Sequence, residues 1–164
     1  MRKTICCLVV LLSVADTHAE ELPTLPDPIS VKGGIPLARV EGVGAQIYVC
    51  SKNAKGGLEW AFREPIAILI AGRNTIGRHY AGPVWEFADG SRVAGKLVAK
   101  VPGQSSQDVP WLKLAVVQQT TAGLAAGATW ILRLNTKGGL LEGGCSTEGE
   151  LHSVPYTATY LFGM

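Results

Sequence analysis

Eight short apolar runs, separated by glycine-rich or polar turns, dominate the sequence from Ile35 onward. They cover residues 46–50, 58–62, 65–71, 84–88, 92–101, 111–118, 129–135 and 156–162. The runs are rich in Val, Ile, Tyr and Trp, which fit the pleated, half-buried surface of β-strands. No window longer than twelve residues carries the 3.6-residue apolar period of an amphipathic helix. The pattern therefore predicts one all-β domain, either a closed barrel or a two-sheet sandwich, with short irregular loops.

Alternation of side chains is clearest in the last two runs. One face is predicted to carry Trp130, Leu132 and Leu134 and the other Ile131, Arg133 and Asn135; Tyr156, Ala158, Tyr160 and Phe162 are likewise predicted to oppose Thr157, Thr159 and Leu161. Arg133 lies between two leucines, so it is expected either on an exposed sheet face or paired with a carboxylate such as Glu86. Gly95 is expected to form a bulge or bend, and the Ala/Gly-rich segment 122–128 a loop.

The stretch GRHYAGPVWEFADGS, residues 77–91, is predicted to be a loop that leads into a hairpin. Asp89-Gly90 suits a two-residue type I′ turn between strands. In that register Phe87 faces Arg92 and Glu86 faces Val93. Trp85 and Phe87 then share the inward face, and Glu86 points to the opposite one.

The first nineteen residues have the layout of a secretory signal peptide. Arg2 and Lys3 precede an apolar run, and small residues follow it at two candidate cleavage sites. We expect cleavage after Ala19, with cleavage after Ala15 as the alternative. The run is shorter than the roughly 20 residues that span a bilayer, and no later segment reads as a membrane span. From the signal-peptide layout we therefore expect the protein to be exported to the periplasm or the extracellular space.

The remaining chain is predicted to have two parts. Residues 20–34 form a proline-rich arm that is expected to lie outside the core, at least over residues 20–30, and residues 35–164 form the single β domain. Loss of residues 1–19 leaves 13 basic and 12 acidic residues, scattered along the chain. We therefore expect no nucleic-acid partner, since such partners require clustered positive charge.

The mature chain keeps two cysteines, Cys50 and Cys145. In an exported protein the simplest use of two cysteines is one disulfide. The alternatives are two free thiols or a redox pair, although the close Cys-x-x-Cys spacing of redox pairs is absent.

Several motifs, taken in order, resemble one secreted family. They are GAQIYVC at 44–50, GRHYAGPVWEFADGS at 77–91, VPWLKL at 109–114, ILRLNTKGG at 131–139, the isolated Cys145 and VPYTATYLF at 154–162. Together they resemble the family catalogued as domain of unknown function 3455, over about residues 42–162. The resemblance implies export and a single domain, and it implies no reaction. Thr159 is a departure from the family pattern, because the pattern leads us to expect an acidic residue at this position.

His79 is the first candidate for chemistry, because histidine can act as a general base near neutral pH. Glu86 or Asp89 could orient it as in a hydrolase, or Tyr80 and Glu86 could join it in a small polar site. The interpretation we favour is that His79 forms a hydrogen bond with the loop backbone and holds the turn in place. A metal could take its ligands from His79, His152, Glu86 and Asp89, but no recognised ligand spacing is present, so we expect no metal and no cofactor.

The aromatic residues offer a second kind of site. The four tryptophans, with Tyr48, Tyr80, Tyr156 and Tyr160, could line a platform for a carbohydrate or an apolar ligand, and a small molecule or a glycan is the partner this implies. The alternative is core packing, which we expect for at least three of Trp60, Trp85, Trp111 and Trp130. His79, Tyr80, Trp85 and Arg133 are the ligand-binding candidates. The favoured function is a non-enzymatic binding or structural module, and the alternative is a hydrolase-like enzyme centred on His79.

Overall fold

A computed structural model describes residues 22–164. The predicted signal peptide and both predicted cleavage sites therefore lie outside the described residues. The described chain contains one short 3₁₀ helix and eight strands: η1 (Asp27–Ile29), β1 (Pro36–Lys52), β2 (Leu58–Ala71), β3 (Asn74–Tyr80), β4 (Val84–Phe87), β5 (Arg92–Val101), β6 (Trp111–Gln119), β7 (Trp130–Gly138) and β8 (Leu151–Gly163). The prediction of an all-β fold is confirmed.

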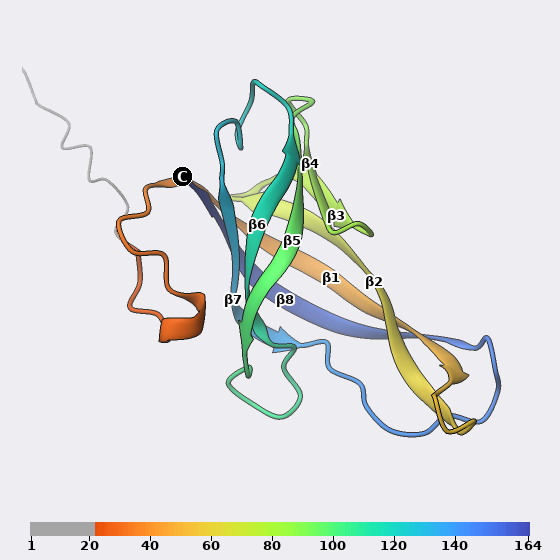
Figure 1. Cartoon of the computed structure of the whole chain (residues 1–164). Helices are drawn as coiled ribbons and strands as arrows, with labels where there is room; N and C mark the ends of the chain where they lie inside the picture. Colours follow the sequence, from red (N-terminus) through yellow and green to blue (C-terminus); the bar gives the residue numbers. More distant parts are fainter. Residues whose placement is uncertain (1–21) are drawn as a thin grey trace, which may run out of the picture.

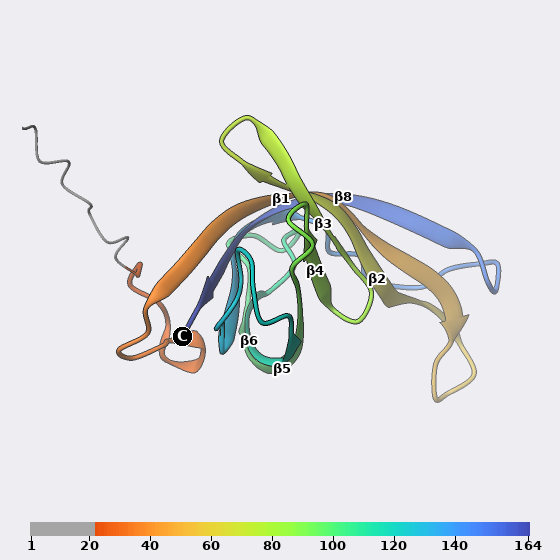
Figure 2. The same ribbon diagram turned by 90° about the horizontal axis from the view of Figure 1, so that it is seen from above.

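The strands form a closed antiparallel barrel in which each pairs with the next and β8 returns to β1. The choice left open between barrel and sandwich is thus decided for the barrel. Seen from above, the long strands β1 and β8 arch along one side, and β5 and β6 lie opposite (Figures 1 and 2). Within the described residues, no helix is long and apolar enough to cross a membrane.

The strand boundaries differ from the sequence prediction in several places. Two predicted runs, 58–62 and 65–71, are halves of the single strand β2, and β3 was predicted as loop. β1 starts ten residues earlier than expected and runs through Gly42 and Gly44. Glycine is needed at position 42 because a Cβ there would lie 2.6 Å from Tyr160 Cε2, so a residue that normally weakens a strand here makes room for a core ring.

The β4–β5 turn is one residue longer than predicted. Glu86 pairs with Arg92 and Trp85 with Val93, so the predicted register is wrong by one residue. The Gly90 N–H donates to the Phe87 carbonyl, and Gly90 has a φ of 84°. This is the three-residue hairpin loop in which a left-handed glycine follows a tight turn. Trp85 and Phe87 still share the buried face, and the register shift at Gly95 confirms the predicted bulge.

The barrel interior forms the main core. Its aromatic centre packs Trp85 edge-to-face against Tyr160 and Phe162, with centroid distances of 5.3 and 5.9 Å. The predicted alternation of β8 is confirmed, because Tyr156, Ala158, Tyr160 and Phe162 all belong to this inner cluster.

A second, smaller core lies on the outer face of β7. Trp130, Leu132 and Leu134 pack there with Leu161 and with Ile29 of the N-terminal arm. Ile29 is completely buried. The prediction that residues 20–30 stay outside the core is therefore wrong for the described part of the arm. The prolines prevent strand pairing, but they do not prevent apolar side chains between them from covering a sheet face.

Cys50 and Cys145 form a disulfide, which confirms the predicted pairing. It fixes the end of β1 to the long segment between β7 and β8. The Trp60 N–H also donates to the Gly143 carbonyl of that segment. The segment thereby lies alongside the beginning of β2 and is hydrogen-bonded to it.

Candidate functional site

The barrel wall has a lateral opening between β2 and β5. β3 pairs with β2 only from Ala67 onward, and β4 pairs with β5 only over Arg92–Ala94. Pro65, which has no N–H to donate, lies just before the point where β3 pairing starts. Because the hairpin β3–β4 is short, residues 61–66 of β2 and 95–101 of β5 lack a strand partner on the sides that face each other, within the described residues. We call this gap the lateral opening.

A cavity of about 300 Å³ lies behind the lateral opening. His79, Trp85, Tyr160 and Arg133 contribute to its inner lining, and Phe62 and Leu97 line it at the opening. A second chamber of about 470 Å³ adjoins it and shares Phe62, Leu97, Leu112 and Arg133. Cavities of this size accommodate small-molecule ligands.

His79 lies inside the barrel and is almost fully buried. Its Nδ1 is 2.8 Å from the Val84 carbonyl oxygen, and its ring stacks on Trp85 with centroids 4.2 Å apart. Because a carbonyl can only accept, Nδ1 carries the proton. Burial is the main reason that the pKa of His79 falls to about 4, and the Arg133 charge lowers it further against the opposing effect of the Val84 hydrogen bond. The imidazole is therefore neutral at physiological pH.

Tyr80 and Glu86 meet on the opposite side of the sheet. The Tyr80 hydroxyl donates to Glu86 Oε2 at 2.7 Å, and Arg78 Nη2 donates to Glu86 Oε1 at 2.8 Å. Both hydrogen bonds lower the pKa of Glu86, and the bond from Tyr80 has the larger effect. Since adjacent strand residues point to opposite faces, the structure does not bring His79 together with Tyr80 and Glu86.

Asp89 is occupied by the turn that contains it. It accepts hydrogen bonds from the Ser91 hydroxyl at 2.6 Å, the Ser91 N–H at 2.8 Å and the Leu124 N–H at 2.8 Å. These bonds, led by the Ser91 hydroxyl, lower its pKa. Asp89 thus ties the 122–128 loop, predicted as such, to the β4–β5 turn. Among the described residues, neither Asp89 nor Glu86 forms a hydrogen bond or ion pair with His79.

Arg133 points into the barrel, so both predicted placements are wrong. Its Nε and Nη2 donate to the Pro110 carbonyl at 3.1 and 2.8 Å, and only 9% of the residue is exposed. No carboxylate of the described residues lies within 4 Å of it. The outer face of β7 was taken to be exposed, but the arm covers it with Ile29. The apolar neighbours Leu132 and Leu134 belong to that outer core.

Three more polar side chains lie deep in the barrel. The hydroxyls of Tyr156 and Tyr160 are 3.1 Å apart. Burial raises the pKa of both, and the charge of Arg133 opposes that rise. Gln46, 1% exposed, lies near Tyr156 and lines the second chamber, yet its amide nitrogen makes no hydrogen bond. Sequence reasoning missed Gln46, although a polar residue at the start of the apolar run QIYVC could have marked it.

The tryptophans are used mainly for packing. Trp85 and Trp130 are buried in the inner and outer cores, and Trp111 is half-buried against the outer core. This agrees with the expectation for three of the four. Trp60 lines the second chamber beside His152, with ring centroids 5.4 Å apart. The described residues contain no group of three or more His, Cys, Asp or Glu side chains that could hold a metal ion.

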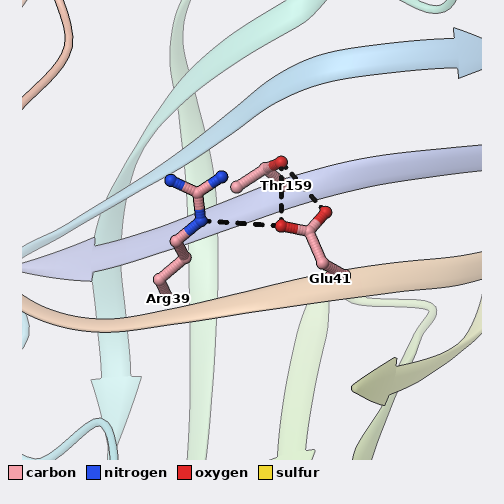
Figure 3. A network of polar contacts seen from close by, with 3 residues as sticks. All are labelled: Arg39, Glu41 and Thr159. Carbon is pink, nitrogen blue, oxygen red and sulfur yellow. Dashed lines mark hydrogen bonds and ion pairs between the residues drawn. The ribbon is translucent and has the colours of Figure 1, made fainter. Parts of the chain in front are cut away.

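Thr159 lies on the outer face, away from both chambers. Its hydroxyl donates to Glu41, with distances of 3.0 and 3.1 Å to the two carboxylate oxygens, and Arg39 Nε lies 3.6 Å from Glu41 (Figure 3). Glu41 pairs directly with Thr159 across β1 and β8. An acidic residue at position 159 would face this carboxylate and repel it. The acidic group at this pair of positions is Glu41 on β1, not residue 159 on β8.

The fold and the cavity together define a small antiparallel β-barrel with an internal chamber and a lateral opening. Residues 69–163 match the family described as a protein of unknown function, DUF3455, and the chain belongs to this family. The family predicted from sequence is confirmed, but the match begins later than predicted and leaves out the GAQIYVC motif. No curated protein and no solved structure matches the chain.

Proposed function

We propose that this protein is a non-enzymatic binding module that takes a small apolar or amphipathic molecule into its barrel. The observation that carries the proposal is the internal cavity behind the lateral opening. Phe62 and Leu97 line that opening and are 54% and 52% exposed. Apolar side chains exposed at the mouth of an apolar cavity gain free energy when a ligand covers them.

The state of His79 favours binding over hydrolysis. A general base works best with a pKa near the working pH, whereas burial lowers the pKa of His79 to about 4. The two carboxylates that could have oriented it, Glu86 and Asp89, are engaged elsewhere. A neutral, hydrogen-bonded imidazole stacked on Trp85 is suited to lining a ligand chamber.

The aromatic residues favour a small molecule over a glycan. Glycan platforms present exposed aromatic rings, whereas Trp85 and Trp130 are 1% and 7% exposed. A ligand that reaches Trp85 must therefore enter the barrel. The ligand is expected to be compact enough for a chamber of about 300 Å³.

Action outside the cytoplasm is part of the proposal. Disulfides persist mainly in oxidising compartments, and the Cys50–Cys145 bond supports such a location. The signal-peptide layout of residues 1–19 points the same way. We propose the periplasm or the extracellular space as the place of binding.

Binding of the neutral fluorophore N-phenyl-1-naphthylamine tests the proposal. Its fluorescence should rise saturably with one molecule per chain. Leu97→Glu should weaken binding about tenfold, because a charge beside an apolar ligand loses hydration. Val117→Glu is the matched control, since Val117 is 61% exposed and lines neither chamber, and it should change binding less than twofold.

Two results would contradict the proposal. One is the absence of saturable fluorescence with the folded protein. The other is loss of binding in Ile68→Glu with normal binding in Leu97→Glu. Ile68 is exposed and pairs with Val43 on the β1–β2 ribbon. That second pattern would place the fluorophore on the outer apolar face of β1 and β2.

A further inference from the structure

The two chambers meet at a buried cation without a counter-ion. Arg133 lines both, is 9% exposed and forms no ion pair with any described residue. Its Nε and Nη2 donate to the Pro110 carbonyl, and the guanidinium also interacts with the Tyr160 hydroxyl. A guanidinium has five N–H donors, so donors remain beyond these. Burial of a charge is costly unless an opposite charge compensates it.

Other groups in the barrel share this shortage of acceptors. Gln46 is 1% exposed, and its amide nitrogen has no hydrogen-bond partner; the same holds for the buried Trp85 indole nitrogen. Gln46 lines the second chamber and Trp85 the first. Three residues with donors that lack full partners therefore line one or both chambers. A ligand that brings acceptor oxygens into the chambers would supply partners for the remaining donors of Arg133.

The charge around the chambers also favours an anion. Arg133, Arg63 and Lys100 line them, against one lining carboxylate, Glu142, and Arg63 is paired with Glu64 at 3.1 Å. His79 is neutral, and burial raises the pKa values of Tyr156 and Tyr160, so neither tyrosine adds negative charge. With Arg63 and Glu64 cancelling, the charged residues of the lining still carry a net positive charge.

We infer that the ligand is a carboxylate-bearing amphiphile whose head group binds Arg133 while its apolar part extends toward Phe62 and Leu97 at the lateral opening. One arginine matches one negative charge, and the planar carboxylate fits the guanidinium. A doubly charged phosphate would bring more charge than Arg133 neutralises. The inference rests on the proposed function, because it assigns a chemical class to the ligand of the same cavity.

A series of ten-carbon ligands with different head groups tests this inference. Decanoate, decanol and decylammonium, each below its micelle concentration, are used to displace N-phenyl-1-naphthylamine from the native protein at pH 7.5, where the carboxylic acid is ionised. Decanoate should bind at least tenfold more tightly than decanol, and decylammonium more weakly than either. Equal affinity for decanoate and decanol would overturn the inference and leave the proposed function standing. If the fluorophore itself does not bind, the proposed function fails.

Variants then locate the head group. Arg133→Met should abolish the preference for decanoate over decanol and leave decanol affinity within about threefold, and Arg133→Lys should keep part of it. Arg78→Gln is the matched control, because Arg78 lies on the outer face beside Glu86, and it should keep the full preference. Loss of the preference in Arg63→Gln but not in Arg133→Met would place the anion at the rim and overturn the inference. If Arg133→Met does not fold, the head-group series on the native protein still tests whether the ligand must carry a carboxylate.

Discussion

His79 occupies a position where only the neutral imidazole is stable. It lies between the Trp85 face and the Tyr160 edge, at centroid distances of 4.2 and 5.2 Å, with one ring nitrogen committed to the Val84 carbonyl. Protonation would place a second positive charge near Arg133 in the same interior. His79 therefore links acid exposure directly to loss of stability.

His79→Gln should change the pH dependence of unfolding. The pKa of His79 is about 4 in the folded state, against about 6.5 when unfolded. The unfolded chain thus takes up a proton first, and stability that is present above pH 6.5 is lost as pH falls toward 4. Between pH 7.5 and pH 4.5 this amounts to on the order of 2 kcal/mol. Glutamine cannot titrate, so the variant lacks this part of the loss.

Urea unfolding at the two pH values measures the difference. The variant should be less stable than the wild type at pH 7.5 by about 1 kcal/mol, and the gap should narrow or reverse at pH 4.5. His152→Gln is the control, since His152 is exposed, and it should follow the wild type at both values. A gap for His79→Gln that is the same at both pH values would show that His79 does not carry the acid sensitivity.

At the scale of elements, the N-terminal arm is part of the fold. Ile29, at the end of η1, is fully buried in the outer core, and the Lys113 ammonium donates to the Ser30 carbonyl at 2.6 Å. The arm thus covers the outer face of β7, which becomes buried on both sides. Because Trp130, Leu132 and Leu134 occupy the outward positions of β7 under the arm, the alternating residue Arg133 points into the interior.

Ile29→Ala should destabilise the protein strongly. Removing a fully buried isoleucine side chain typically costs about 2–5 kcal/mol. Ile35→Ala is the matched control, because Ile35 lies close in sequence but is 56% exposed, and its cost should stay near 0.5 kcal/mol. Chemical denaturation measures both. A cost below about 1 kcal/mol for Ile29→Ala would mean that the arm does not contribute to folding in solution.

Sequence periodicity could predict those elements whose two faces differ. The inward residues of β8 and the pair Trp85 and Phe87 follow simple alternation. β3 was missed because its short run NTIGRHY has few apolar residues, so pairing with its neighbours determines its structure. Arg133 and Gln46 could not be placed, since their orientation depends on which face of each strand other parts of the chain cover.

At the scale of the whole molecule, unequal strand lengths create the site. The long strands β1, β2 and β8 close one side of the barrel, while the short hairpin β3–β4 leaves β2 and β5 separated lower down (Figure 1). The lateral opening and its access to the cavity follow from this mismatch, whereas the inward position of Arg133 follows from the covered outer face of β7. The sequence could predict the all-β domain, with barrel and sandwich left open, but not the opening, which depends on where pairing between distant strands stops.

The tryptophan indole N–H signals of ¹⁵N-labelled protein test the central claim most directly. Trp85 lines the first chamber and Trp60 the second, whereas Trp130 lies in the outer core beyond the barrel wall. During titration with decanoate, the Trp85 signal should shift and saturate at one ligand per chain, Trp60 should follow if the ligand extends into the second chamber, and Trp130 should stay in place. A Trp85 signal that does not move at saturating decanoate, or a shift confined to Trp130 and Trp111, would contradict binding inside the barrel.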